Sequence, residues 1–139
     1  MQIPNASISE IFGDSDFEWV VIDFEHGAID LSQLPDLIRA LELSNTVSFV
    51  RIPESDPKLV NQILDCGANG IILANCNNHK DLKNLIKSST MPPKGTRGVG
   101  FSRANLFGKK LKLYQKDFSK PFFIAQIENK EGYENLNEI

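Results

Sequence analysis

The sequence predicts an α/β fold made of about four βα units around a parallel sheet. Short apolar runs rich in Val, Ile and Phe alternate with longer segments whose apolar residues recur every three or four positions. The first pattern is typical of buried strands and the second of amphipathic helices. Alternation at this rhythm is typical of βαβ units, whose strands run parallel. A chain of 139 residues can bury a sizeable core, so we expect residues 1–139 to form a single domain.

The clearest predicted strand is residues 18–24, a nearly continuous apolar run that leads directly into charged residues. Such a run is typical of a parallel strand that is covered on both faces. The three other predicted strands are residues 47–52, 70–74 and 121–127.

Helix signals lie between these runs. Asp30 followed by Gln33 fits a capping box that opens a helix, and Asp56 followed by Pro57 fits an N-cap with a proline in the first turn. Gly67 suits the end of the second of these helices. The other predicted helices are residues 7–12, 78–88, 109–116 and a last one that starts near Lys130.

Composition narrows the possible function classes. The net charge is −3 and the pI is near 5.4, which leaves no basic surface for nucleic acid or an acidic membrane. The apolar runs are far shorter than a membrane span, and no signal peptide is visible at the start. Cys66 and Cys76 have the spacing of no zinc or redox motif, which favours free thiols. We therefore expect a cytoplasmic protein without nucleic-acid or membrane partners.

Polar side chains follow every predicted strand at the point where it ends. They are Asp23, Glu25 and His26, then Arg51, then Asn75, and finally Gln126 and Glu128. The carboxyl ends of parallel strands meet at one edge, where β/α barrels carry their catalytic residues. Taken singly, each residue also fits a structural role, such as an ion pair between Arg51 and Asp23. The coincidence over four strands favours an active site.

The long segment of residues 91–108 is rich in Gly and Pro. A loop of this length in a compact domain is usually functional or disordered. Arg97 and Gly98 lie near its centre, where they could also form nothing more than a turn.

Seven segments of the chain carry a resemblance to a known family. They are residues 17–27, 50–53, 56–57, 64–68, 92–100, 103–108 and 126–128. In this order, and over nearly the whole chain, they are similar to the HpcH/HpaI aldolase family. Its members are class II, metal-dependent pyruvate aldolases such as 4-hydroxy-2-oxoheptanedioate aldolase and 2-dehydro-3-deoxyglucarate aldolase. The resemblance implies a partial (β/α)8 TIM barrel of the phosphoenolpyruvate/pyruvate type.

The resemblance also implies roles for individual residues. His26 matches the catalytic base of the family, and Asp65 matches the acid that orients this base. Arg51 matches the arginine that holds the pyruvate oxygen, and Asp23 matches an acid near this arginine and the metal-bound waters. The residue types suit the chemistry, because a neutral imidazole can accept a proton near physiological pH and a fixed guanidinium can stabilise an enolate.

A metal site is implied in the same way. Glu128 matches one of two metal-binding carboxylates, Gln126 lines the same site, and the loop with Arg97 and Gly98 would border the substrate. Hard oxygen ligands favour Mg²⁺ or Mn²⁺, which would act as a Lewis acid on the pyruvate enolate. The implied partners are a 2-oxo acid (pyruvate) and an aldehyde. The family usually forms oligomers, so we expect a homo-oligomer at full length.

The implied function is that of a carbon–carbon lyase, which reversibly cleaves a 4-hydroxy-2-oxo acid to pyruvate and an aldehyde. Two alternatives stay open. One is a citrate-lyase-like enzyme of the same barrel type, which would need a contact to CoA. The other is a truncated, inactive family member.

The chain departs from the family pattern at two places. Ala74, Asn75 and Cys76 stand where the family usually has Pro-Met-Val, which would alter a wall of the pocket. The sequence also ends at Ile139, ahead of the segment with the second metal-binding carboxylate. A β/α barrel takes roughly 250 residues, so about half of one is expected here. We expect a fragment of a longer enzyme, and we expect the isolated chain neither to bind metal tightly nor to turn over.

Overall fold

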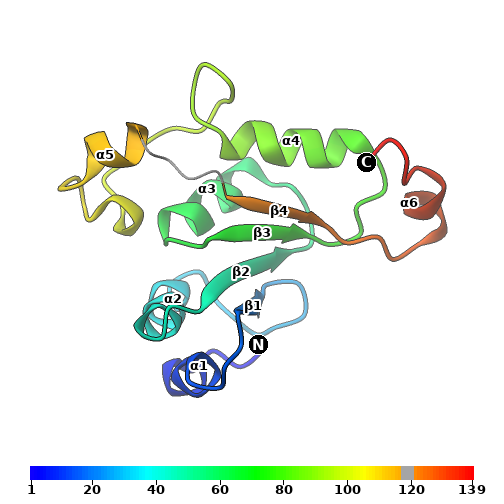
Figure 1. The fold of residues 1–139 in the computed structure, drawn as a ribbon. Coiled ribbons are helices and arrows are strands. Elements are labelled where there is room, and N and C mark those ends of the chain that lie inside the picture. The colour runs from blue at the N-terminus through cyan, green and yellow to red at the C-terminus, as the bar shows by residue number, and fades with distance from the viewer. Residues whose placement is uncertain (117–120) are drawn as a thin grey trace.

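The computed structural model describes residues 1–116 and 121–139. Within these ranges one sheet has four strands, every neighbouring pair is parallel, and the spatial order is the chain order. The strands are β1 (Trp19–Asp23), β2 (Val47–Ile52), β3 (Gly70–Leu73) and β4 (Phe122–Ala125). The arrows of β2, β3 and β4 point to the side where α6 (Lys130–Glu134) lies (Figure 1). This arrangement confirms the predicted α/β fold.

Helices connect the strands, as the sequence predicts. Besides α6 they are α1 (Ala6–Gly13), α2 (Leu34–Leu43), α3 (Pro57–Asp65), α4 (His79–Ser89), the 3-10 turn η1 (Arg103–Asn105) and α5 (Leu111–Lys116). Asn5, Asp56 and Asn78 cap α1, α3 and α4, because each side-chain oxygen accepts an N–H of the first helical turn.

The start of α2 differs from the prediction. The helix begins at Leu34, whereas the sequence predicts a start near Asp30. Gln33 Oε1 accepts a hydrogen bond from the Asp30 N–H at 2.8 Å, which is one half of the predicted capping box. Residues 31–33 form a turn that is not part of the helix. Pro35 then lies in the first turn of α2, where its missing N–H costs no hydrogen bond and its fixed φ favours the helix.

The hydrophobic core lies between the helices and one face of the sheet. Successive residues of a strand point to opposite faces, and Val20, Ile22, Val50, Ile52 and Ile71 are buried at alternate positions. They form one cluster with the apolar stripes of α2, α3 and α4. This packing fixes the register in which Asp23 lies beside Arg51.

The opposite face of the sheet carries a row of aromatic rings. Trp19 packs edge-on against Phe49 at 5.7 Å between ring centroids, and Phe49 packs against Phe122 at 6.1 Å. Trp19 is 52% exposed and Phe122 is 66% exposed. The face that would form the inside of a complete barrel is therefore apolar and partly open to solvent.

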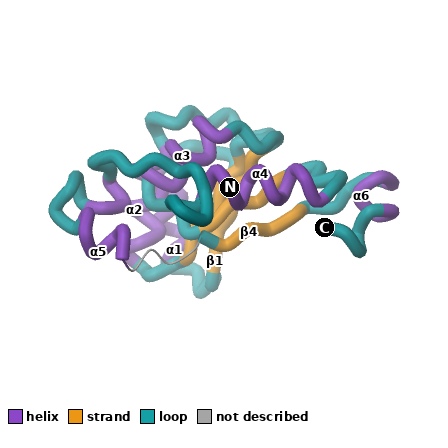
Figure 2. The backbone as a smooth tube through the Cα atoms, turned by 90° about the horizontal axis from the view of Figure 1, so that it is seen from above, coloured by secondary structure: helices purple, strands orange, loops and turns teal. Residues whose placement is uncertain are grey.

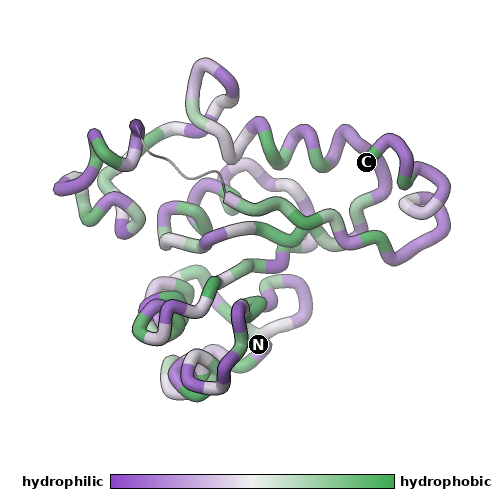
Figure 3. The backbone as a smooth tube through the Cα atoms, in the orientation of Figure 1, coloured by the Kyte–Doolittle hydropathy of each residue, from purple (hydrophilic) through white to green (hydrophobic). Residues whose placement is uncertain are grey.

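The two ends of the strands differ in character. α5 and α6 lie at opposite ends in both Figure 1 and Figure 2. The strands are mainly hydrophobic, whereas the segments around α6, past the ends of β3 and β4, are mainly hydrophilic (Figure 3). In the described ranges, no helix has both the length and the apolar character that crossing a bilayer requires. The polar ends of the strands are therefore the candidate functional site.

Candidate active site

An ion pair between Asp23 and Arg51 lies at the centre of the polar strand ends. The two residues are register partners at the ends of β1 and β2. Arg51 Nε donates to Asp23 Oδ1 at 3.0 Å, and Arg51 Nη2 donates to Oδ2 at 2.6 Å. The Asp23 side chain is 5% exposed and that of Arg51 is 21% exposed. A two-pronged pair of this kind fixes the plane of the guanidinium as well as its position.

Asp23 accepts further hydrogen bonds from three other groups. The backbone N–H groups of Glu25 and His26 donate to Oδ1 at 3.1 and 3.2 Å, and Gln2 Nε2 donates to Oδ2 at 2.8 Å. Burial alone would raise the pKa of Asp23, but the hydrogen bonds from Arg51, Gln2 and the two backbone groups outweigh it and hold the pKa well below its usual value. Asp23 is therefore an anion at neutral pH and anchors Arg51, and it cannot act there as a proton donor.

A tight turn projects Glu25 and His26 from the end of β1. Gly27 N–H donates to the Asp23 carbonyl oxygen at 3.1 Å and closes the turn. A Cβ at position 27 would lie 2.2 Å from that same oxygen, so only glycine fits here. The turn places the two side chains next to Arg51.

Glu25 connects Arg51 with His26. Glu25 Oε2 is 3.3 Å from Arg51 Nη1 and 3.8 Å from His26 Nε2. The His26 side chain is 67% exposed, whereas that of Glu25 is 17% exposed. The imidazole can thus be reached by a small molecule from solvent, while the Glu25 carboxylate beneath it faces the guanidinium. The sequence alone gave Glu25 no specific role.

Glu128 lies beyond the end of β4 and is bound to the end of β3. Its Oε1 accepts the backbone N–H of Asn75 at 2.6 Å, and its Oε2 accepts Gln126 Nε2 at 2.9 Å. The Asn129 amide donates to the side-chain oxygen of Asn75 and so joins the same two strand ends. The pKa of Arg51 is raised, first by its hydrogen bond to Asp23 and also by the charge of Glu128. Charged groups at the ends of β1 and β4 therefore act on the guanidinium at the end of β2.

Asp65 and Arg97 lie at the other end of the sheet, away from the polar strand ends. α3 runs back from the end of β2 to the start of β3. Its last residue, Asp65, therefore lies at the opposite end of the sheet from His26, which follows the end of β1. Arg97 Nη2 donates to Asp65 Oδ1 at 2.8 Å, and the Arg97 guanidinium is 5.7 Å from the Tyr114 ring centroid. Arg97 is 1% exposed. In the described residues Asp65 therefore pairs with Arg97, and its role toward His26 stays a prediction.

Gly98 follows Arg97 on the exposed part of the same loop. A Cβ added there would meet no atom within 4 Å, so no packing demands glycine at this position. The structure does not bring Gly98 to the candidate site.

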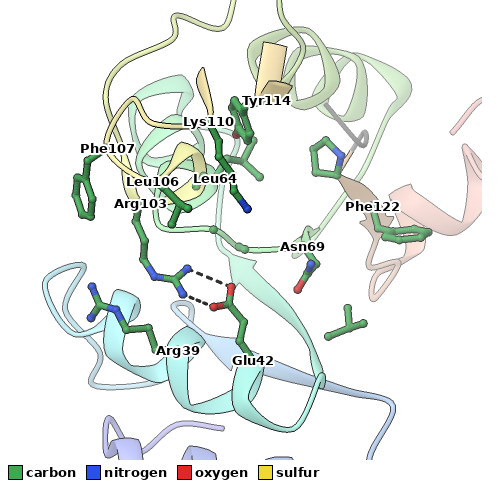
Figure 4. Close-up of a pocket in the computed structure, with 15 residues that line it drawn as sticks. Arg39, Glu42, Leu64, Asn69, Arg103, Leu106, Phe107, Lys110, Tyr114 and Phe122 are labelled. Atoms are coloured by element: carbon green, nitrogen blue, oxygen red, sulfur yellow. Dashed lines mark hydrogen bonds and ion pairs between the residues drawn. The ribbon is translucent and has the colours of Figure 1, made fainter. Parts of the chain in front are cut away.

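A pocket of ≈ 580 Å³ also lies at this other end of the sheet, at the starts of β2 and β4 (Figure 4). Arg103 reaches across it to Glu42, and Arg103 Nη1 donates to the Cys66 carbonyl oxygen at 2.8 Å. None of the predicted site residues lines this pocket.

The candidate site fits a metal ion only in part. Glu128 offers one carboxylate, which is the hard oxygen ligand that Mg²⁺ and Mn²⁺ prefer. Among residues 1–116 and 121–139, no three His, Cys, Asp or Glu side chains are grouped as a metal site requires. The described residues therefore offer a metal ion one carboxylate ligand and not a complete site.

Two residues of the site, Asn129 and Gln2, were not predicted from the sequence. Asn129 could have been found, because an Asn directly before a predicted helix is a typical N-cap, and it does cap α6. Gln2 has no such signal, because its contact with Asp23 spans 21 residues.

Comparison with known proteins decides the family. Residues 2–139 match the family described as HpcH/HpaI aldolase/citrate lyase. The chain belongs to this family. A relative in Roseobacter denitrificans, named hydroxypyruvate/pyruvate aldolase, is 31% identical over 141 residues, with 100% of this chain and 55% of the relative covered. The 5-keto-4-deoxy-D-glucarate aldolase of Escherichia coli is 29% identical over 138 residues, with 99% and 54% covered.

The fold of this HpcH/HpaI family chain agrees with its relatives. The crystal structure of an HpcH/HpaI aldolase/citrate lyase family protein from Burkholderia cenocepacia matches with a TM-score of 0.92 at 26% identity. The match covers 100% of this chain and 57% of that one. The predicted partial barrel of four βα units is therefore confirmed, and the chain spans about half the length of the curated relatives it matches.

Proposed function

We propose that the protein with this sequence is a carbon–carbon lyase that reversibly cleaves a 4-hydroxy-2-oxo acid to pyruvate and an aldehyde. One observation carries the proposal. At the carboxyl edge of a parallel sheet, Asp23 holds the Arg51 guanidinium 3.3 Å from Glu25. The same Glu25 oxygen lies 3.8 Å from the solvent-exposed imidazole of His26. The aldolase names of the two curated relatives support the same reaction class.

Arg51 would bind the oxygen on which negative charge develops when the carbon–carbon bond breaks. Its Nε and Nη2 already donate to Asp23, and Nη1 lies 3.3 Å from Glu25, so little reorganisation is needed when substrate arrives. Arg51 keeps part of its side chain exposed, which leaves an approach for a small anion. Asp23 stays ionised and holds this cation in place.

His26 would accept the proton of the substrate hydroxyl in the cleavage direction and return it in the condensation direction. Its exposed ring is free to meet a substrate that Arg51 holds. General base catalysis of this kind contributes about 10²- to 10⁴-fold to the rate.

Glu128 would supply one ligand to a divalent ion, Mg²⁺ or Mn²⁺, with Gln126 beside it. When bound, such an ion polarises the keto oxygen as a Lewis acid. A single carboxylate binds such ions weakly, so we expect weak metal binding by these 139 residues. We further propose a cytoplasmic protein that forms homo-oligomers at full length.

Two experiments on the 139-residue chain test this function. In the first, pyruvate with Mg²⁺ is titrated into the isotope-labelled chain and followed by NMR. We expect shifts at Arg51 and around Glu128 that disappear in the Arg51→Met variant. If pyruvate moves no resonance in an Arg51-dependent manner, the proposed binding site is wrong.

In the second experiment, pyruvate release from a 4-hydroxy-2-oxo acid is measured with Mn²⁺. We expect no robust turnover by this chain. Any residual release should be abolished by His26→Ala and left unchanged by His79→Ala, at the start of α4. Release that survives in His26→Ala would contradict the role of His26. The family description also includes citrate lyase, so cleavage of a CoA thioester is assayed in parallel. Activity on the thioester alone would favour that alternative.

A further inference from the structure

The first residues of the chain lie along the outer edge of β1. The Met1 amino nitrogen donates to the Val21 carbonyl oxygen at 2.5 Å, and the Asp23 N–H donates to the Met1 carbonyl oxygen at 3.0 Å. Met1 thus bonds to the residues on either side of Ile22 in β1, which is the hydrogen-bond pattern of a parallel strand pair. Met1 also packs against the hydrophobic core, and Ser9 Oγ lies 3.4 Å from its sulfur. This segment is therefore held at the strand end that carries the candidate site.

Gln2 follows directly and reaches the centre of that site. Its Nε2 donates to Asp23 Oδ2 at 2.8 Å, and the same oxygen accepts Arg51 Nη2 at 2.6 Å. A Cβ on Gly27 would lie 3.3 Å from Gln2 Cα, so the glycine of the turn leaves the space that Gln2 needs. The contact thus joins two segments that are far apart in the sequence.

The two oxygens of Asp23 are held unequally. Oδ1 accepts from three donors, namely the N–H groups of Glu25 and His26 and Arg51 Nε. Oδ2 accepts only from Arg51 Nη2 and Gln2 among the residues described. The terminal torsion of an aspartate is soft, so Oδ1 alone does not fix the plane of the carboxylate. The partner that holds Oδ2 in that plane, apart from Arg51 itself, is Gln2.

We propose that Gln2 is a positioning residue of the candidate site. Its amide holds the Asp23 carboxylate in the plane in which both oxygens meet Arg51, and so sets the orientation of the guanidinium. The consequence for catalysis rests on the proposed lyase function. The orientation itself does not, and it can be measured without substrate.

Hydrogen exchange of the Arg51 Nε–H, followed by NMR on the free chain, tests this inference. Gln2→Met keeps the length of the side chain but removes the donor, and we expect about tenfold faster exchange because a hydrogen bond to a charged group is lost. Gln2→Lys restores a donor of similar reach and should bring the rate back toward that of the parent chain. Gln115→Ala, an exposed glutamine on α5, is the matched control and should change nothing.

Unchanged exchange in Gln2→Met would overturn the inference. Equal acceleration in Gln115→Ala would overturn it too, because a general loosening of the fold would then explain the change. If Gln2→Met does not fold, Gln2→Lys decides: exchange at the parent rate supports a donor role, and fast exchange in a folded chain excludes it. Because no pyruvate is present, these outcomes are independent of whether the proposed reaction occurs.

Discussion

Arg51 binds Asp23 through two nearly parallel hydrogen bonds, while its third nitrogen, Nη1, lies 3.3 Å from Glu25. Both carboxylates come from the segment that ends β1, whereas the guanidinium comes from β2. The cation is thus fixed by its neighbour strand and keeps one side toward solvent. An arrangement of this kind holds the guanidinium in one orientation, and it also makes the fold depend on the pair.

Asp23→Asn should destabilise the protein. The substitution leaves the Arg51 charge without its main partner in a largely buried position, and breaking such a pair costs about 3 kcal/mol. The free energy of unfolding is measured by urea denaturation. Asp36→Asn is the matched control, because Asp36 forms an exposed pair with Arg39, which is worth at most about 1 kcal/mol. Equal losses in the two variants would show that the Asp23–Arg51 pair carries no special weight.

The stability of the protein should fall in acid, in part because of Asp23. The pKa of Asp23 is lower in the folded chain than its ordinary value of about 3.9, so below that value the unfolded state binds more protons. The stabilising contribution is full above the unfolded pKa and is lost as the pH falls through the folded pKa. Urea midpoints are compared between pH 5 and pH 2 for the parent chain and Asp23→Asn. We expect a steeper loss in the parent, and parallel curves would contradict the assignment.

Asp65→Asn should weaken the fold without affecting the candidate site. Arg97 is buried and donates to Asp65, so loss of the carboxylate should cost about 2 kcal/mol. Because Asp65 lies at the other end of the sheet, the NMR signals of the His26 ring and the Arg51 guanidinium should stay in place. A shift of the His26 ring signals in Asp65→Asn would contradict this expectation and support the role that the family resemblance implies for Asp65.

Gly27→Ala should disturb the turn that presents His26. The added Cβ would lie 2.2 Å from the Asp23 carbonyl oxygen, so the turn must open and lose the hydrogen bond that closes it. We expect a loss of more than about 1 kcal/mol together with shifted signals of Glu25 and His26. Gly100→Ala is the control, because a Cβ there meets no atom within 4 Å and stability should change by less than about 0.5 kcal/mol. Similar behaviour of the two variants would contradict the steric argument.

Much of the site could be predicted because it follows from local patterns. Asp23 and Arg51 close two apolar runs, and parallel strands bring such ends together whatever the details of packing. The start of α2 was predicted less accurately than the polar strand ends. The predicted bond between Asp30 and Gln33 forms, but Pro35 favours a first helical turn that begins later, at Leu34. The family resemblance implies chemical roles for Asp65 and Arg97, but it does not say where in the structure these two residues lie. Their position follows from the direction of α3, which carries Asp65 away from the polar edge.

By itself, the sequence determined the α/β class, the order of the strands and the polar residues at their ends. Periodicity and residue type are properties of neighbours along the chain, and they suffice for these features. Apart from Asp23 and Arg51, only the tertiary structure decided which polar groups meet. It joined Gln2 to Asp23, Glu25 to Arg51 and Arg97 to Asp65 across 21, 26 and 32 positions. Such contacts depend on how helices and strands pack, and no local pattern in the sequence encodes that packing.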